Sequence, residues 1–491
     1  MNVNYLKKVE EITKLLQAWQ YRYLTPYGKI VIIKSLVLSK LSHVALVVPS
    51  LKNNDLKQLE RLMFNFLWSG KSAKIAKKDS FNNLKQGGLS MVDIDLFWQA
   101  LKCSWIRRLA KTEAFWPKIL NENLRKIGTS VNHILCEGPN SLIVMSRKIS
   151  NIFRQNVLKA VANLLTKACT NSAESFFLFP VFSNPIFRLD GKMLDRKKFN
   201  GVPFKISTVA DFYRNKDQVY TINELNALYN LNLPQNQLEK IHNSINTAKN
   251  ELTSVKINWQ PRPHHSLLTK IALKQQKGCR SFYVILRSTP GELTSLSTYE
   301  AKWNLKLDQT LPIAYWKSVW ELHANIQLNN QFKWLQCQIL RYGLYTNNRV
   351  SKFKPEVYEL CDLCNIHIEN PLTLFWECQV AQQFWSQVRI FLAGNTFHLP
   401  DSRLGILFGF PTEPWNSLKN TAVMIGKLVI WKAKIKKHLP TLTHFKRSLK
   451  CYLVMLKYCS SIDSDRSFFD KKWDSVFSDL EQDGSDLSEP D

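Results

Sequence analysis

Apolar residues recur at intervals of three and four along much of the sequence, which is the period of an amphipathic helix. The clearest stripe starts after Asn54 or Asp55, either of which is a good N-cap, and it stops at Gly70. Its members are Leu56, Leu59, Leu62, Met63, Phe66 and Leu67. Further stripes occupy residues 29–41, 96–109 and 221–253. The pattern predicts a mainly α-helical, multi-domain protein.

Changes in this pattern divide the sequence into five predicted parts. Prolines interrupt the middle of the chain, and Gln260–His265 packs two of them into six residues, which predicts a linker. The last 19 residues hold seven acids and no base. The predicted parts are a helical bundle at 1–115, a mixed α/β middle segment at 116–260, a helical segment at 261–335, a helical C-terminal domain with a small cysteine knuckle at 336–470 and a disordered acidic tail at 471–491.

The charge of the chain predicts a class of binding partner. The 491 residues include 67 Lys and Arg against 39 Asp and Glu, a net charge of +28. Such an excess predicts a polyanionic partner, with nucleic acid first and an anionic membrane second. A hydrophobic fraction of 45% excludes a mostly disordered chain. The sequence has no uninterrupted apolar run of about 18 residues, so a transmembrane helix is not predicted.

The N-terminus lacks the basic-then-apolar order of a secretory signal, which predicts an intracellular protein of the nucleus or cytoplasm. In that compartment free thiols or a metal site are expected rather than disulfides. Cys361 and Cys364 have the Cys-x2-Cys spacing that lets two thiolates hold one metal ion from a tight turn, and Cys378 follows downstream. The sequence contains no P-loop, no Gly-x-Ser-x-Gly elbow and no His-Glu-x-x-His motif.

A series of short motifs then gives the sequence a resemblance to a known family. The sequence resembles the part that follows the polymerase palm in reverse transcriptases of long interspersed elements, the retrotransposons without long terminal repeats. The motifs are Trp19-Gln20-Tyr21-Arg22-Tyr23-Leu24-Thr25-Pro26-Tyr27-Gly28-Lys29, Phe66-Leu67-Trp68-Ser69-Gly70-Lys71, Gly87-Gly88-Leu89, Leu101-Lys102-Cys103-Ser104-Trp105-Ile106-Arg107-Arg108, Cys361-Asp362-Leu363-Cys364, Leu374-Phe375, Cys378 and Ile430-Trp431. The resemblance is strong over the first 110 residues and moderate from 334 to 435.

The resemblance implies that residues 1–115 are the thumb, which grips RNA and DNA, including an RNA–DNA hybrid, through phosphates. In an intact element such parts would support target-primed reverse transcription. The paired aspartates that hold two Mg²⁺ ions in such polymerases have no counterpart here, because the sequence contains no Asp-Asp pair. We therefore expect a truncated, non-catalytic binding protein without a Mg²⁺ site. The alternatives are a fragment of an active polymerase encoded by a longer reading frame, or a decayed product without function.

Basic residues are the candidate phosphate contacts, and the competing interpretation of each one is a solvated charged face. Arg22 is either such a contact or paired with a carbonyl or acid within the thumb. The stretch from Lys427 to Lys450 is a candidate contact for template RNA, a membrane-surface or nuclear-import segment, or a helix with one buried face. The candidates are Arg22, Lys29, Lys34, Lys40, Lys71, Lys74, Lys77, Lys78, Arg107, Arg108, Lys432, Lys434, Lys436 and Lys437.

The cysteines are the candidate ligands of one structural zinc ion. The family that the sequence resembles has a His at the position of Thr373, and Thr is not a zinc ligand. His367 is then the candidate fourth ligand, with water as the alternative to it. The competing interpretation is a decayed knuckle with three reduced cysteines.

Overall fold

The computed structural model is predominantly helical, which confirms the predicted fold class. It describes residues 3–109, 115–126, 129–171, 173–199, 202–203, 206–252, 257–258, 266–273, 278–288, 297–326, 330–395, 397–462 and 473–482. The predicted linker at Gln260–His265 lies outside the described residues.

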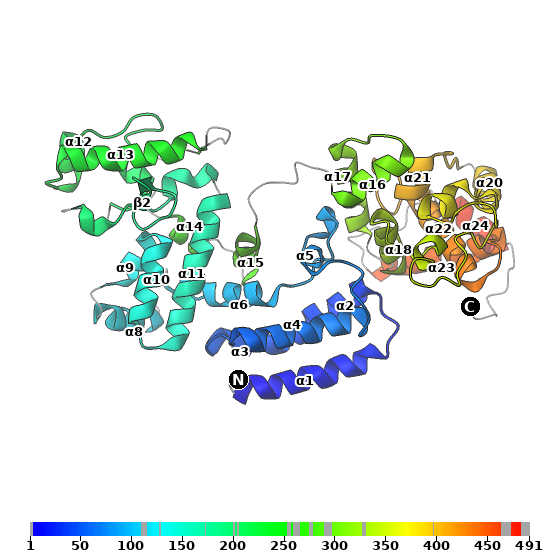
Figure 1. Cartoon of the computed structure of the whole chain (residues 1–491), viewed down its shortest axis with the longest axis horizontal. Helices are drawn as coiled ribbons and strands as arrows, with labels where there is room; N and C mark the ends of the chain where they lie inside the picture. Colours follow the sequence, from blue (N-terminus) through cyan, green and yellow to red (C-terminus); the bar gives the residue numbers. More distant parts are fainter. Residues whose placement is uncertain are drawn as a thin grey trace. The chain divides into compact units, whose positions relative to one another are not determined.

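The chain forms two compact units, each assembled from segments that are far apart in the sequence (Figure 1). Unit 1 consists of Met1–Trp19, Ile33–Phe64 and Val92–Glu292. Unit 2 consists of Gln20–Ile32, Asn65–Met91 and Leu293–Asp491. The predicted helical bundle at 1–115 therefore contributes residues to both units.

Unit 1 is mainly helical and carries one small hairpin, and the last residues of two of its helices, α1 and α4, belong to unit 2. Its elements are α1 (Val3–Gln20), the π-helix η1 (Ile33–Val37), α3 (Leu38–Val47), α4 (Asn53–Trp68), α6 (Ile94–Cys103), α7 (Ile106–Leu109), α8 (Phe115–Arg125), α9 (Val131–Cys136), α10 (Pro139–Lys148), α11 (Ile152–Asn171), η3 (Ala173–Leu178), β1 (Arg188–Leu189), β2 (Lys192–Met193), η4 (Arg196–Lys198), η5 (Val209–Phe212), α12 (Ile222–Tyr229), α13 (Gln235–Asn250), α14 (Leu267–Leu273) and α15 (Arg280–Arg287).

Strands are confined to a small hairpin in the part of the chain that the structure describes. β1 and β2 pair antiparallel, with Arg188 opposite Met193. Asp190 and Gly191 form the two-residue loop, and both have positive φ, as a type I′ turn requires. Beside this hairpin, the ring of Phe176 packs on those of Phe179 and Phe187, with centroids 5.8 Å apart in each pair, in the core of unit 1.

Unit 2 is a helical assembly around a second apolar core. Trp303 and Trp316 pack on Phe408 with ring centroids 5.0 and 5.1 Å apart. α22 packs against both α18 and α23 (Figure 1). The elements are α2 (Pro26–Ile32), the end of α4, α5 (Lys77–Ser80), η2 (Leu84–Gln86), α16 (Thr298–Leu307), α17 (Ile313–Asn325), α18 (Asn330–Leu340), α19 (Asn347–Val350), the π-helix η6 (Thr373–Glu377), α20 (Gln379–Gly394), α21 (Arg403–Phe408), α22 (Leu418–Lys436), α23 (Leu442–Ile462) and α24 (Asp474–Gln482).

Part of the predicted disordered tail is helical, which corrects that prediction for residues 473–482. Trp473, Val476 and Leu480 recur at helical spacing and are at most 2% exposed. Burial of these three apolar side chains stabilises the helix, although the acidic composition of the segment predicted disorder.

Several lysines are buried because they close the ends of helices. The Lys102 ammonium donates to the carbonyls of Ala45, at 2.7 Å, and Val48, at the end of α3. Lys333 donates to Ala324 and Ile326 at the end of α17, both at 2.9 Å. The last carbonyls of a helix lack intrahelical partners and carry partial negative charge, so a cation satisfies them. Burial lowers the pKa of Lys102 to about 7 and that of Lys333 to about 8.

Candidate functional site

Three cysteine sulfurs gather in unit 2, as the spacing predicted. The Sγ atoms of Cys361, Cys364 and Cys378 all lie within 4.8 Å of one another, and this set could hold a metal ion. Cys361 and Cys378 are fully buried. Cys361 and Cys364 lie on one turn, and Cys378 is the N-cap residue of α20.

Local backbone geometry explains how the turn presents two sulfurs together. Leu360 pairs with Ile368 in an antiparallel bridge, and the Cys361 N–H donates to the His367 carbonyl at 2.9 Å. The Asn365 N–H donates back to the Cys361 carbonyl at 2.8 Å. Asn365 has a φ of 53°, a left-handed conformation that Asn tolerates better than most residues. The chain therefore reverses directly after Cys364.

Hydrogen-bond donors surround the sulfurs. The pKa of Cys378 is lowered, first because the Cys361 thiol donates to its sulfur and also because the Ala381 N–H does so, while burial opposes both effects. The same thiol–sulfur bond and burial raise the pKa of Cys361, against donation from the N–H groups of Cys364 and Leu363. N–H donors of this kind stabilise thiolates, which are the form that binds metal.

The predicted fourth ligand is not part of this group. In the described part of the chain, the gathered ligand set is the three cysteines and does not include His367. The His367 side chain is exposed, and its backbone carbonyl is the atom that serves the turn. Thr373 is buried, and its hydroxyl donates to Glu377 at 2.9 Å and accepts from Asn370 at 2.9 Å. The structure therefore brings together three of the four predicted ligands, and His367 as the fourth stays a prediction.

A buried carboxylate supports the cysteine turn. Glu369 is 0% exposed and accepts from the Asp362 N–H at 3.2 Å and from the Asn347 N–H at 2.8 Å. Lys434 forms an ion pair with it at 3.1 Å. Burial raises the pKa of Glu369, and Lys434 opposes the shift. Lys434 is thus buried in the fold, which corrects its assignment as a phosphate contact. Sequence reasoning missed Glu369, because nothing in the sequence distinguishes it from the surface acids.

Six cations form what we call the basic cluster: Lys71, Lys74, Lys302, Lys306, Arg349 and Lys352. Burial lowers the pKa of Lys74, and so do the charges of Lys71 and Arg349. The pKa of Lys302 is lowered in the same way, by burial and then by Lys352, Lys306 and Arg349. A charge shifts the pKa of another group in this way only when the two lie near one another. Two of these residues, Lys71 and Lys74, were predicted, whereas Lys302, Lys306, Arg349 and Lys352 were missed because the fold brings them together.

Aromatic rings lie under the basic cluster. Lys74 lies over Tyr345, with its Nζ 5.2 Å from the ring centroid, and Arg349 lies over the same ring at 5.1 Å. Lys302 Nζ lies 4.1 Å from the centroid of Tyr342. Rings hold cations in place through their negative faces without neutralising them, so the charges stay available to an anion.

The other predicted contacts are distributed over both units. In unit 2, Lys29 is 4% exposed and donates to the Phe66 carbonyl at 3.0 Å and to the Ser69 hydroxyl, which corrects its assignment as a phosphate contact. In unit 1, Lys40 forms an ion pair with Glu11 at 3.5 Å. The side chains of Arg22, Lys34, Lys71, Lys77, Lys78, Arg108, Lys436 and Lys437 are exposed, and those of Arg107 and Lys432 are half-buried.

One helical stretch in the described residues, Pro26–Val47, is long and apolar enough to cross a membrane. Core helices of soluble proteins meet the same criterion. Ile33, Val37 and Leu41 from this stretch are fully buried in the fold. Part of the stretch therefore packs in the protein core, whereas Val31 and Val47 are exposed.

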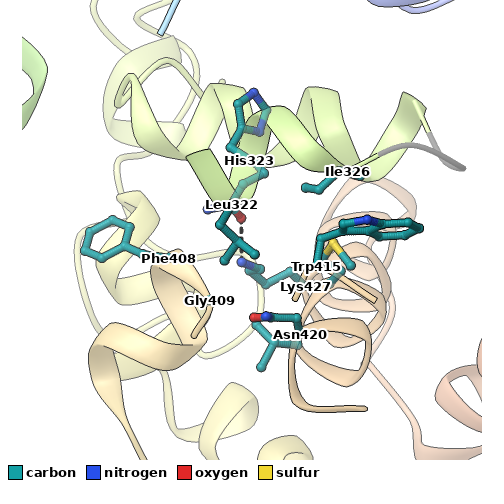
Figure 2. A pocket seen from close by; sticks show the side chains of 11 residues that line it. Leu322, His323, Ile326, Phe408, Gly409, Trp415, Asn420 and Lys427 are labelled. Atoms are coloured by element: carbon teal, nitrogen blue, oxygen red, sulfur yellow. Dashed lines mark hydrogen bonds between the residues drawn. The ribbon is translucent and has the colours of Figure 1, made fainter. Parts of the chain in front are cut away.

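A small pocket lies in unit 2 beside α22 (Figure 2). Figure 2 shows the Lys427 side chain between Leu322 and Asn420. Its ammonium donates to the Gln336 amide oxygen at 2.5 Å and to the Leu407 carbonyl at 3.2 Å, and burial lowers its pKa to about 7. The fold itself thus provides Lys427 with partners, in the same way as the other lysines that close helices.

No protein-family model matches the sequence.

Proposed function

We propose that the chain binds nucleic acid through the basic cluster, without sequence preference and by phosphate contacts. The observation that carries this proposal is that Lys74 and Arg349 lie over the same Tyr345 ring, 5.2 and 5.1 Å from its centroid. Besides burial, neighbouring cations lower the pKa of Lys74 and that of Lys302, and Arg349 is among these neighbours in both cases. Like charges held this close repel one another, and a polyanion relieves the repulsion. Each lysine or arginine that contacts a phosphate also displaces cations condensed on the nucleic acid, and their release increases the entropy.

The resemblance to retrotransposon reverse transcriptases favours RNA, DNA or their hybrid as the polyanion. In an intact element these segments would hold the template during target-primed reverse transcription. In that context we propose a binding role for this chain. The polymerase reaction would take place at a palm that carries paired carboxylates.

We further propose that the metal at the three cysteines is zinc and that its role is structural. Thiolate ligands favour zinc among the common divalent ions, and a Cys-x2-Cys turn with a third cysteine is typical of zinc knuckles. Cys361, Cys364 and Cys378 would hold the ion, with the fourth position open to a ligand from outside the set. Zinc there would fasten the turn to the start of α20.

Binding of the purified chain to an RNA–DNA hybrid at two salt concentrations tests the proposed function. Fluorescence anisotropy of a labelled hybrid measures the dissociation constant. We expect affinity to fall steeply as salt rises, because counterion release drives the association. Affinity that is independent of salt, or no binding at low salt, would contradict the proposal.

A further inference from the structure

Five large apolar side chains are exposed on the segment that carries the cysteine turn. The exposed fractions are 57% for Phe353, 86% for Tyr358, 41% for Leu360, 56% for Ile366 and 50% for Ile368. Leu360 and Ile368 are partners in the antiparallel bridge, so their side chains lie on the same face. Exposed apolar side chains do not stabilise the fold, so this group of five indicates a surface that a binding partner covers.

The apolar group continues into the basic cluster. The ring of Phe353 meets the ring of Tyr345 edge to face, with centroids 6.2 Å apart. Tyr345 in turn lies under Lys74 and Arg349. A ligand that contacts Phe353 therefore lies beside the charges proposed to bind phosphates.

Three acidic residues lie on the same segment, and two of them have partners within the fold. Asp362 lies 3.6 Å from Lys434, and the Glu359 carboxylate accepts from the Ser351 hydroxyl at 3.1 Å. Glu356 is exposed on the same loop, between Lys354 and Tyr358. These three acids are exposed, but they do not outweigh the six cations of the basic cluster, so the surface complements an anion with flat apolar parts.

We infer that this surface binds unpaired nucleotides, with Phe353 and Tyr358 stacking on bases while the basic cluster holds the phosphates. Bases in a duplex are stacked on each other and cannot reach a protein ring, whereas bases of a single strand stack on exposed aromatic side chains whatever their sequence. Leu360 and Ile368, paired in the bridge, add exposed apolar surface on the same segment. The inference deepens the proposed function and rests on it, because it names single-stranded nucleic acid as the preferred ligand.

The test compares a short labelled oligodeoxythymidine with a blunt duplex of the same length, using the full metal-loaded chain. The variant is Phe353→Ala/Tyr358→Ala, and the matched control is Ile390→Ala, which removes a side chain that is 70% exposed on α20 of the same unit. Far-UV circular dichroism and metal content establish that each variant is folded. A third arm measures binding to phosphatidylserine vesicles.

We expect the double variant to bind the oligodeoxythymidine about 100-fold more weakly, roughly tenfold for each lost ring, while its affinity for the duplex is unchanged. The control should bind both ligands as the unmodified chain does. Equal affinity of the double variant and the unmodified chain for the oligodeoxythymidine would overturn the inference and leave the proposed function intact. Equal losses for both ligands, or vesicle binding that depends on the two rings, would also overturn it. Absence of binding to every nucleic acid would overturn the proposed function itself.

Discussion

The carboxylate of Glu369 accepts a hydrogen bond at 3.2 Å from the backbone N–H of Asp362, which lies between the two cysteines of the Cys-x2-Cys turn. The same carboxylate accepts from the first N–H of α19, the helix that carries Arg349. The cysteine turn and one cation of the basic cluster are therefore attached to a single buried group. This relationship connects the candidate metal centre with the candidate phosphate surface.

Replacing this group should destabilise unit 2. We expect Glu369→Gln to lower the free energy of unfolding by about 3 kcal/mol, because the buried Lys434 then loses its closer ionic partner and keeps Asp362, at 3.6 Å. Urea unfolding measures the change. Glu359→Gln is the matched control, because that carboxylate is exposed and its loss should cost less than about 0.5 kcal/mol. Equal effects of the two substitutions would show that Glu369 has no special supporting role.

The cysteines should bind about one zinc ion per chain, measured by inductively coupled plasma analysis of the purified protein. We expect Cys378→Ser to abolish most of the bound zinc, because it removes one of three gathered sulfurs. Cys451→Ser is the control, since Cys451 is a free, exposed cysteine outside the gathered set. His367→Ala should also keep the zinc. Loss of zinc in His367→Ala would establish His367 as a ligand and contradict the three-sulfur site.

The buried lysines should make stability depend on pH. The pKa of Lys102 is about 7 in the folded chain, whereas an unfolded lysine titrates near 10.4. Between these values the unfolded chain holds a proton that the folded chain has lost, so the free energy of unfolding rises with pH, by up to about 1.4 kcal/mol per unit for this residue. Below about pH 7 both states hold the proton and this contribution vanishes.

Lys102→Met tests the assignment by unfolding at pH 7 and pH 9. The substitution should reduce the rise in stability between these pH values and should also cost about 2 kcal/mol, since the carbonyls of Ala45 and Val48 lose their donor. Lys57→Met, on the exposed side of α4, should leave the pH dependence unchanged. A rise of the same size in both variants would show that Lys102 is not the titrating group.

The helical class could be predicted because burial and local pattern agree. The stripe of Leu56, Leu59, Met63, Phe66 and Leu67 is buried in the structure as its spacing requires. The cysteine turn could be predicted for the same reason, since Cys361 and Cys364 are brought together by a local chain reversal.

The contacts of individual charged side chains could not be predicted, because their partners come from distant segments. Lys29 contacts a carbonyl 37 residues away, and Lys434 pairs with a carboxylate on the cysteine segment. A sequence shows the charge of a lysine but not the distant group that accepts its hydrogen bonds. For the same reason Arg349 and Lys302 joined the basic cluster only in the folded chain, with Lys74 as the predicted member beside them.

The salt dependence of hybrid binding in a charge-reversal variant tests the central claim most directly. The variant is Lys74→Glu/Arg349→Glu, and the control is Lys240→Glu, an exposed lysine on α13 of unit 1. The measurement is the slope of the logarithm of the association constant against the logarithm of salt concentration. If these two cations contact phosphates, the slope becomes shallower by about 2 in the variant and stays the same in the control. Identical slopes in the variant, the control and the unmodified chain would contradict the account.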